Sequence, residues 1–350
     1  MNKKLLAIAV GAAVLMPGLA LADISIYGRA HVSLDQLDDG NDYSELNLSS
    51  NSSRLGFRGD TKLATGDLTA FFQIEQEINF AQGEGADWAG RDTFVGLKGD
   101  FGRVRAGRFD SPFKAARGPA NLFGDQVGDM RNLTRVGDAR FDERMPNTIE
   151  YQTPDFSGFK ATLGYSIHED DTHMSDADGE GVSLALGYTQ GGFEGALAYE
   201  TYGEDNGRGE REAVRAAAAY KLGAVKLVGF FQTSEYTDAV NPAKEDTLTA
   251  DVWGLGGEFK AGQQTYLRAM WLNREADADD SKTDMVAVGV EHRLDKAFRI
   301  YANYAVVMND DATNLTPWNQ ARTTGVDGAD GIDATGQDAT GLSLGARYDF

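Results

Sequence analysis

Apolar and polar residues alternate through most of the chain. The last segment shows this most clearly, because Leu342, Leu344, Ala346, Tyr348 and Phe350 alternate with small or polar residues. The same alternation recurs in segments of ~8 to 13 residues, the length of a tilted membrane strand, at 24–33, 68–78, 182–188, 193–200 and 298–306. The pattern predicts two-faced β-strands whose apolar stripes face outward.

Short and long connections alternate between these segments. The short ones are rich in Gly, Asp and Lys and lie near residues 60–67, 99–102, 154–158, 190–192, 221–224, 260–262 and 293–297. The long ones lie near residues 36–44, 81–90, 109–145, 168–181, 203–211, 235–249, 275–281 and 309–340. Seven short turns and eight long loops predict sixteen antiparallel strands, an even number typical of bacterial barrels with an aqueous interior. An exported soluble β-sandwich or propeller explains neither the aromatic-rich outward stripes nor this rhythm.

Two segments fit the alternation poorly. Between Arg91 and Lys98 apolar residues occur in both parities, and between Glu45 and Gly59 the parity of the apolar residues reverses. A β-bulge is one explanation of such a reversal. Burial against a neighbouring subunit or against an inserted loop is another.

The N-terminal residues are typical of a secretory signal. Two lysines, an apolar run over residues 5–15 and a small-x-small pattern at residues 20–22 predict cleavage after residue 22. An anchor helix is the alternative, but the run is shorter than the ~20 apolar residues that a helical span needs. We therefore expect residues 1–22 to be a cleaved signal peptide and residues 23–350 to form one transmembrane barrel. Both ends of the mature chain then lie on the side of the short turns, which is the periplasm in an outer-membrane barrel.

Composition supports a barrel over a helical membrane protein. Aromatic residues make up 10% of the chain, which has 42 Gly and 7 Pro, and the mean hydropathy is −0.39. A barrel can be this polar because half of each strand faces water. With no Cys, disulfides and thiolate metal sites are excluded. The formal charge of −21 becomes −23 without Lys3 and Lys4, which argues against nucleic acid as a partner.

Acidic residues gather in the long connections, for example at 169–171, 176–178 and 275–280. These clusters are expected to be solvated loops. Carboxylates also suit hard divalent cations such as calcium, but none of the clusters has the spacing of a recognised calcium loop.

No motif indicates catalysis or a resident metal. Ser111 and Lys114 match an S-x-x-K pattern, but its companion motifs are absent and the setting predicts a loop rather than a helix start. His168 and His173 lie among acids in one loop without ligand spacing. The sequence predicts no catalytic residues, no metal site and no cofactor.

Five passages, in this order and spacing, carry a resemblance to a known family. They are residues 26–29, 51–59, 94–109, 147–156 and the terminal Tyr348-Asp349-Phe350. Together they resemble the trimeric general-diffusion porins of Gram-negative outer membranes, over essentially all of the mature chain. The resemblance implies a homotrimer of sixteen-stranded barrels in contact with outer-membrane lipid and lipopolysaccharide. It also implies that the terminal strand, through Tyr348 and Phe350, is read by the insertion machinery.

The resemblance further implies that the third long loop, about 109–143, folds into the lumen and narrows it. In the family this loop presents carboxylates, which correspond to Asp125 and Asp129, and the opposite wall carries basic residues. The matching basic positions are Arg29, Arg54, Arg91 and Arg144; strand parity independently directs all of them inward except Arg91, for which it does not decide.

The function implied is passive diffusion of small hydrophilic solutes and ions, without enzymatic activity. A barrel hydrolase and a barrel that serves as adhesin or receptor are the alternatives. Because the loops are acidic, we expect a modest cation preference that weakens as salt screens the charges. The sequence does not decide between general and substrate-selective passage.

Overall fold

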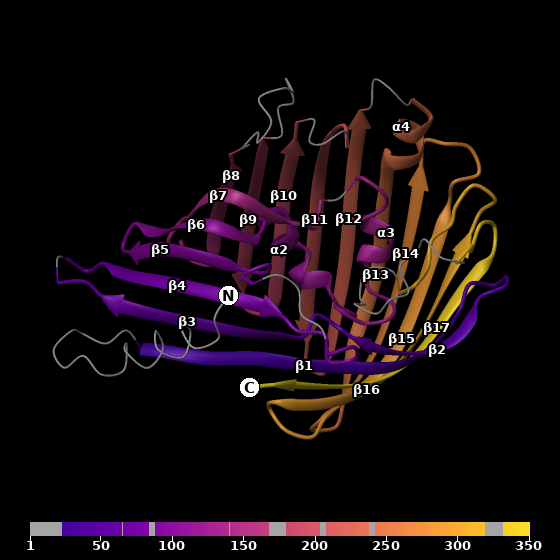
Figure 1. The fold of residues 1–350 in the computed structure, drawn as a ribbon, viewed down its shortest axis with the longest axis horizontal. Helices are drawn as coiled ribbons and strands as arrows, with labels where there is room; N and C mark the ends of the chain where they lie inside the picture. Colours follow the sequence, from indigo (N-terminus) through magenta and orange to yellow (C-terminus); the bar gives the residue numbers. More distant parts are fainter. Residues whose placement is uncertain are drawn as a thin grey trace.

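The alternating segments form strands of a single antiparallel sheet in the computed structural model (Figure 1). The structure describes residues 23–64, 66–83, 88–139, 141–167, 180–203, 208–237, 242–318 and 332–350. The strands are β1 (Asp23–Asp38), β2 (Ser44–Ser50), β3 (Arg54–Lys62), β4 (Thr69–Glu77), β5 (Thr93–Gly99), β6 (Gly102–Asp110), β7 (Arg144–Gln152), β8 (Phe159–Ser166), β9 (Gly181–Gln190), β10 (Phe193–Tyr202), β11 (Glu210–Leu222), β12 (Val225–Thr237), β13 (Ala250–Ala261), β14 (Thr265–Ala276), β15 (Thr283–Arg293), β16 (Phe298–Asn309) and β17 (Asp338–Asp349).

The sheet closes because the last strand pairs with the first. β1 pairs with β17 from Arg29 opposite Asp349 to Asp38 opposite Thr340, so the ladder has no free edge. On its other side β1 pairs with β2 along one half and with β3 along the other. The seventeen strand segments therefore make sixteen wall strands, which confirms the predicted barrel.

The interruption between β2 and β3 explains the parity reversal in this part of the sequence. Val32 pairs with Ser50 and Arg29 pairs with Arg54, so three residues on one strand oppose two on the other. Within this extra length Ser52 has a positive φ of 58°. A β-bulge with one extra residue has this form, and the interpretation of the reversal as a bulge is confirmed.

The other irregular segment is explained by the barrel interior. Val95 and Leu97 on β5 face outward, with 62% and 42% of their surface exposed. Phe94 faces inward, where its ring centroid lies 6.0 Å from that of Phe71 and 5.8 Å from that of Phe109. Apolar residues thus occur in both parities because Phe94 belongs to an aromatic cluster at the start of the third long loop, not because the outer face is interrupted.

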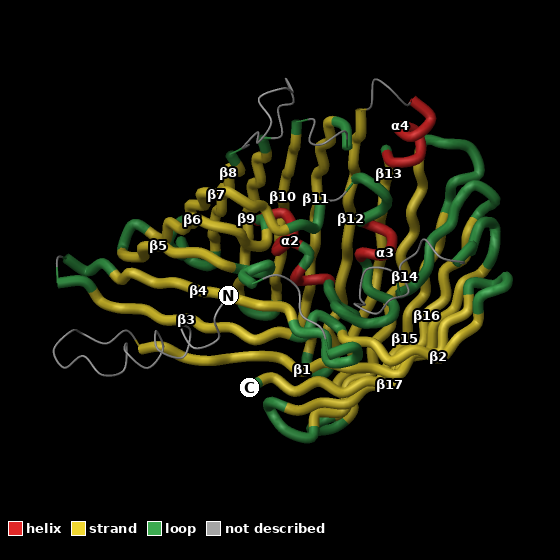
Figure 2. The backbone as a smooth tube through the Cα atoms, viewed as in Figure 1, coloured by secondary structure: helices red, strands yellow, loops and turns green. Residues whose placement is uncertain are grey.

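The connections follow the predicted short-long rhythm (Figure 2). The third long loop, residues 111–143, is called L3 below; it contains α2 (Pro112–Ala116), the 3₁₀ helix η1 (Gly118–Ala120) and α3 (Arg131–Thr134). Helix α4 (Pro242–Leu248) lies in the loop between β12 and β13. Among the described residues, no helix is long and apolar enough to cross a membrane.

L3 lies inside the ring of strands, where α2 and α3 are visible against the wall (Figure 1). Its apolar side chains pack onto inward-facing alanines, valines and methionines of β11–β17, in a cluster that includes Leu122, Phe123, Val127, Met130 and Leu133 of L3. A second cluster joins Phe113 and Phe141 at the two ends of L3 to inward residues of β10–β12. Burial of these side chains, at roughly 25 cal/mol per Å² of apolar surface, holds L3 on one side of the barrel.

Candidate pore constriction

Both ends of L3 are held by a buried ion pair. The carboxylate of Asp142 accepts two hydrogen bonds from the guanidinium of Arg215 on β11, at 2.7 and 3.0 Å, and both side chains are fully buried. Arg117 of L3 also donates to Asp142, at 3.0 Å, and Arg215 donates to the carbonyl of Phe113 at 3.1 Å. Burial would raise the pKa of Asp142, but Arg215 and Arg117 outweigh it and hold that pKa well below its usual range.

Side chains of the wall under L3 hold the middle of the loop. Arg268 on β14 donates to the carbonyl of Leu122 at 2.7 Å. Asn303 on β16 donates to the side-chain oxygen of Gln126 at 2.7 Å. The backbone N–H of Gly128 donates to the carbonyl of Pro317, at 2.7 Å, in the last long loop. L3 is therefore bonded to several strands as well as packed on them.

The tip of L3 carries Asp125 and Asp129, which have different environments. Asp125 has a φ of 61° and its side chain is 21% exposed. Asp129 is fully buried: its carboxylate accepts from Arg131 at 2.6 Å and from the backbone N–H of Asp125 at 2.7 Å. Asp129 therefore shapes the turn that presents Asp125 and does not expose its own carboxylate to the lumen.

Asp125 contacts the barrel wall through Arg29 of β1, the strand that pairs with β17. The Arg29 Nη1 lies 3.3 Å from one Asp125 oxygen, and Arg131 donates to the other at 2.9 Å. Burial would raise the pKa of Asp125, but Arg131, Arg54 and Arg29 together hold it well below the usual range. Asp125 is therefore permanently charged at physiological pH.

Arg29 belongs to an arginine cluster that the sequence predicted only in part. Arg29, Arg299 and Arg347 all donate to the carboxylate of Asp349 near the C-terminus, at 3.0, 3.1 and 2.9 Å. Asp349 lies between the outward Tyr348 and Phe350, so strand parity alone would have placed it inside. Strand parity could not show that three arginines meet at Asp349, because this depends on the pairing of β1, β16 and β17.

Arg54 and Arg91 share one carboxylate on the adjacent strand β4. The Nε of Arg91 lies 2.6 Å from Glu75, and its Nη1 lies 3.2 Å from Glu77. Arg54 lies 3.5 Å from Glu75 and is less tightly paired. Arg91 is only 4% exposed, so it acts chiefly to neutralise these acids, whereas Arg54 remains open to the lumen.

Arg144 lies inside the barrel but not at the tip of L3. Its Nε is 2.7 Å from Asp92 and 3.4 Å from Asp110 at the base of L3. The structure thus brings Asp125 together with Arg29, with Arg54 in electrostatic reach, and holds Arg91 and Arg144 in separate ion-pair groups. Arg131, Asp142 and Arg215 were not singled out in the sequence, because each depends on how L3 folds.

The S-x-x-K segment begins a helix, contrary to the expected loop. The Ser111 hydroxyl accepts a hydrogen bond from the backbone N–H of Lys114 and caps α2, and the Lys114 amine bonds Asp110 at 2.8 Å. The segment therefore stabilises the start of L3. No group of three or more metal-ligating side chains occurs among the described residues, and His168 and His173 lie outside them.

The carboxylate of Asp125 on L3 and the guanidiniums on the wall place charges of opposite sign at the lumen. Low-dielectric walls focus the field lines of such charges, and arginine keeps its charge at any relevant pH. The arrangement can order water and sort ions, and no bond-making chemistry is needed for either.

Comparisons with known proteins agree with this architecture. The Gram-negative porin family profile matches residues 7–312. The outer membrane porin protein 32 of Delftia acidovorans is 30% identical, over 100% of both chains. The solved anion-selective porin from Comamonas acidovorans superposes with a TM-score of 0.76 at 25% identity, covering 94% of this chain and 100% of that one. OmpT of Vibrio cholerae in a trimer form has a TM-score of 0.67 at 18% identity, covering 94% and 99%.

Proposed function

This chain belongs to the family of Gram-negative porins, and we propose that L3 and the arginine-bearing wall form the constriction of its channel. The barrel is an outer-membrane channel for passive diffusion of small hydrophilic solutes. The contact between Asp125 and Arg29 carries the proposal about the constriction, because it joins the tip of L3 to the arginine-bearing part of the wall at 3.3 Å. The relatives are described as porins, which favours a channel over a barrel hydrolase or an adhesin.

At the constriction, polar solutes pass because they exchange hydrogen bonds with ordered water. A lipophilic solute must displace that water without replacing its hydrogen bonds, and it is slowed. L3 sets the size limit by reducing the free cross-section. The proposed constriction residues are Asp125, Arg29 and Arg54, with Arg299 and Arg347 added from the structure.

We propose that the constriction prefers anions, instead of the cation preference expected from the acidic loops. Asp129 is buried and paired with Arg131, so Asp125 is the partly exposed carboxylate that remains at the described tip of L3. Arg29, Arg54, Arg299 and Arg347 are each 17–20% exposed nearby. The solved porin from Comamonas acidovorans, which is described as anion-selective, supports the same ion preference.

Reversal potentials across a salt gradient test the constriction. Asp125→Asn should make the channel more anion-selective, and Arg54→Gln combined with Arg299→Gln should move it toward cations. Both effects should weaken as salt rises, because the Debye length falls from ≈ 10 Å at 0.1 M to 3 Å at 1 M. Asp155→Asn, in an exposed turn, is the matched control. If all variants conduct with the wild-type reversal potential, the constriction lies elsewhere.

We also propose a homotrimer with the short turns in the periplasm. Strands β4–β8 have only 7 to 9 residues, whereas β11–β14 have 12 or 13. At ~3.3 Å per residue and ~45° tilt, the short strands span only ~16–21 Å, less than the ~25 Å apolar band of an outer-membrane barrel. A neighbouring subunit would cover this short wall, which lies beside the second long loop.

Native mass spectrometry in mild detergent tests the trimer. The expected species is a trimer, and a charge on the short wall, Leu97→Glu, should convert it to monomer. Leu267→Glu on the long wall, similarly exposed, is the matched control and should leave the trimer intact. A wild-type protein seen only as monomer would contradict the proposal.

A further inference from the structure

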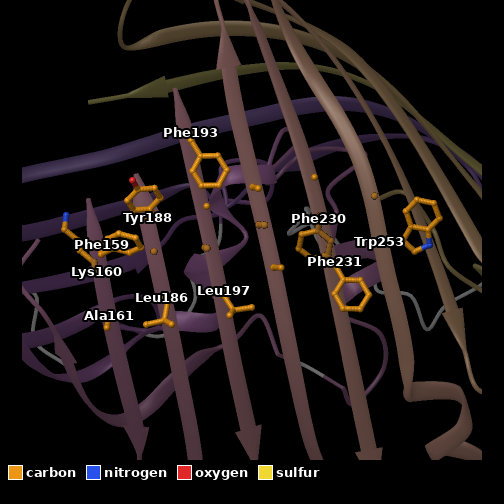
Figure 3. Close-up of a pocket in the computed structure, with 18 of the residues that line it drawn as sticks. Phe159, Lys160, Ala161, Leu186, Tyr188, Phe193, Leu197, Phe230, Phe231 and Trp253 are labelled. Carbon is orange, nitrogen blue, oxygen red and sulfur yellow. The ribbon is translucent and has the colours of Figure 1, made fainter. Parts of the chain in front are cut away.

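Two of the hollows in the barrel wall differ in what surrounds them. One lies on the outer face over β8–β13 and is lined by apolar side chains such as Leu186, Leu197 and Trp253, which face lipid (Figure 3). The other has a volume of about 320 Å³ and lies on β3–β6, beside the start of β1, at the left of Figure 1. This smaller hollow faces the lumen, so a dissolved solute can reach it.

Strand parity places the side chains of the smaller hollow on the lumen side of the wall. Along β4, Phe71 has the same parity as Glu75, whose carboxylate pairs with Arg54 in the lumen. The ladder sets Phe71 opposite Asp60 on β3 and opposite Gly96 on β5. The other side chains of this parity in the hollow are Arg58, Gln73, Phe94, Lys98 and Arg103.

The hollow lies between the proposed constriction and the short turns. Arg54 and Arg58 are four residues apart on β3, so at ~3.3 Å per residue Arg58 lies ~13 Å along the strand from the constriction. β3 ends at Lys62, just before the short turn to β4. A solute that crosses the constriction therefore passes through this part of the lumen.

Two half-buried aromatic rings form the floor of the hollow. The rings of Phe71 and Phe94 meet edge to face, with centroids 6.0 Å apart. Phe71 lies close against the wall at Gly96, where a Cβ would lie 2.5 Å from its Cζ. The inner wall of an aqueous barrel is mostly polar. Ring surface left open to water here favours contact with an apolar group of a solute, and best with another ring.

Basic side chains surround these rings. The Lys98 amine lies 5.8 Å from the Phe71 centroid, near the ~6 Å limit of a cation–π contact, and bonds Asp60 at 2.8 Å in a pair about half exposed. Arg58 donates through Nε to the Ser25 hydroxyl at 3.3 Å, and no carboxylate pairs with it among the described residues. The Nη groups of Arg58 are therefore available to an anion.

Arg103 completes the rim from β6. It lies 3.0 Å from Glu150, but Glu150 also binds Arg105 at 2.7 Å, so two guanidiniums share one carboxylate. The Arg103 side chain keeps 32% of its surface exposed. Three basic residues and one acidic residue line the hollow, and its net positive charge attracts anions.

We propose that this hollow binds a small aromatic carboxylate. Its ring would contact Phe71 and Phe94, and its carboxylate would contact Arg58 and Lys98. Arginine can bond a carboxylate through two parallel N–H groups. An anion without a ring would leave the floor in water, and a neutral ring would leave Arg58 without a new partner. The volume is at the low end of the ~300–1,000 Å³ of small-molecule pockets, which suits an acid with a single ring.

Fluorine NMR titration of the purified, folded protein in detergent tests the site. The probe is para-fluorobenzoate; fluoroacetate lacks the ring, and para-fluorobenzyl alcohol lacks the charge. We expect para-fluorobenzoate to bind most tightly of the three. Arg58→Gln should weaken its binding about tenfold through loss of a charge-assisted pair. Phe71→Leu should weaken it about threefold, because an aromatic contact is lost at similar side-chain volume.

Arg293→Gln is the matched control. Arg293 lies 4.1 Å from the Tyr266 centroid, as Arg58 lies 4.9 Å from the Tyr27 centroid, but it is on β15 outside the hollow. Its replacement removes the same charge and should leave binding unchanged. An equal loss in both variants would reduce the binding to general attraction by charge and overturn the site.

Three further outcomes would overturn the proposal. They are no binding of para-fluorobenzoate by the wild type, equal binding of fluoroacetate, and binding that is lost in Arg54→Gln but unchanged in Arg58→Gln. The last would move the carboxylate to the constriction. Reversal potentials of the same variants report the constriction separately, so a failure of this site is distinguishable from a failure of the proposed function.

Discussion

The inner wall under L3 and the inner wall that L3 leaves uncovered differ although both are made of alternating strands. Under L3, many inward positions of β11–β16 are small or apolar, as at Ala217, Ala287 and Val307, which are buried. On β6 and β7 several inward positions are charged: Arg103 and Arg105 pair with Glu150 at 3.0 and 2.7 Å. Apolar contacts are favourable where L3 packs on the wall. On the uncovered wall, Arg103 and Arg105 keep 32% and 13% of their side-chain surface exposed, so the desolvation of these guanidiniums is incomplete.

The seam between β1 and β17 joins these two walls, and breaking it should have the largest effect. Phe350 exchanges two backbone hydrogen bonds with Gly28, at 2.8 and 3.0 Å, and its ring covers that glycine. Deleting Phe350, or replacing Tyr348 and Phe350 by Ala, should block assembly more than it weakens an assembled barrel, since an unclosed barrel exposes edges to lipid.

Heat-modifiable migration of outer-membrane fractions measures this assembly. Gly28→Val should have a similar effect, because its Cβ would lie 2.4 Å from the Phe350 ring and 2.7 Å from the Arg54 carbonyl oxygen. Tyr304→Ala is the control, because it removes a similarly exposed aromatic ring from the outer face of β16, away from the seam. A normal folded yield from the double alanine variant would count against the role of the terminal residues.

Releasing L3 from the wall that it covers should have the next largest effect, here on the size of the channel. Asp142→Ala leaves Arg215 buried without its carboxylate, which costs about 3–5 kcal/mol for a buried ion pair. We expect higher single-channel conductance and faster entry of larger sugars in liposome swelling, while the barrel itself still assembles. Asp155→Ala, in an exposed turn, should change neither quantity. Unchanged sugar exclusion in a folded Asp142→Ala channel would show that the apolar clusters hold L3 without this ion pair.

A pH dependence at the base of L3 should be the smallest effect. Burial lowers the pKa of Lys114 to about 8, with Arg144 and Arg117 adding to the shift and Asp110 opposing it. The amine therefore loses its proton between about pH 7 and 9, and the docked state gains stability as pH rises from about 8 to the ordinary value of ≈ 10.4. The reversal potential should shift slightly toward cations over pH 7–9, and Lys114→Arg should remove this step. A step that persists in the variant would assign it to another group.

Alternation and loop rhythm alone predicted the barrel, its sixteen wall strands and the inward direction of Arg29, Arg54 and Arg144. These features are local or repeat along the chain, since the side-chain period of a strand is two and a tilted span has a narrow range of lengths. The bulge between β2 and β3 was also visible, as a reversal of parity. The resemblance to porins added L3 and Asp125, which periodicity could not supply.

The tertiary structure alone decided which charges meet. Asp129 and Asp125 are four residues apart and look alike in the sequence, yet one is buried against Arg131 and the other reaches Arg29, because the turn between them is closed by the Asp129 carboxylate. Asp349, at the end of the chain, accepts from Arg29 of β1 because the barrel closes there, and from Arg299 because β16 pairs with β17. The contacts of Arg29 with Asp125 and Asp349, and of Arg299 with Asp349, join residues far apart in sequence. They follow from the register of the closed sheet and the packing of L3, which no local pattern contains.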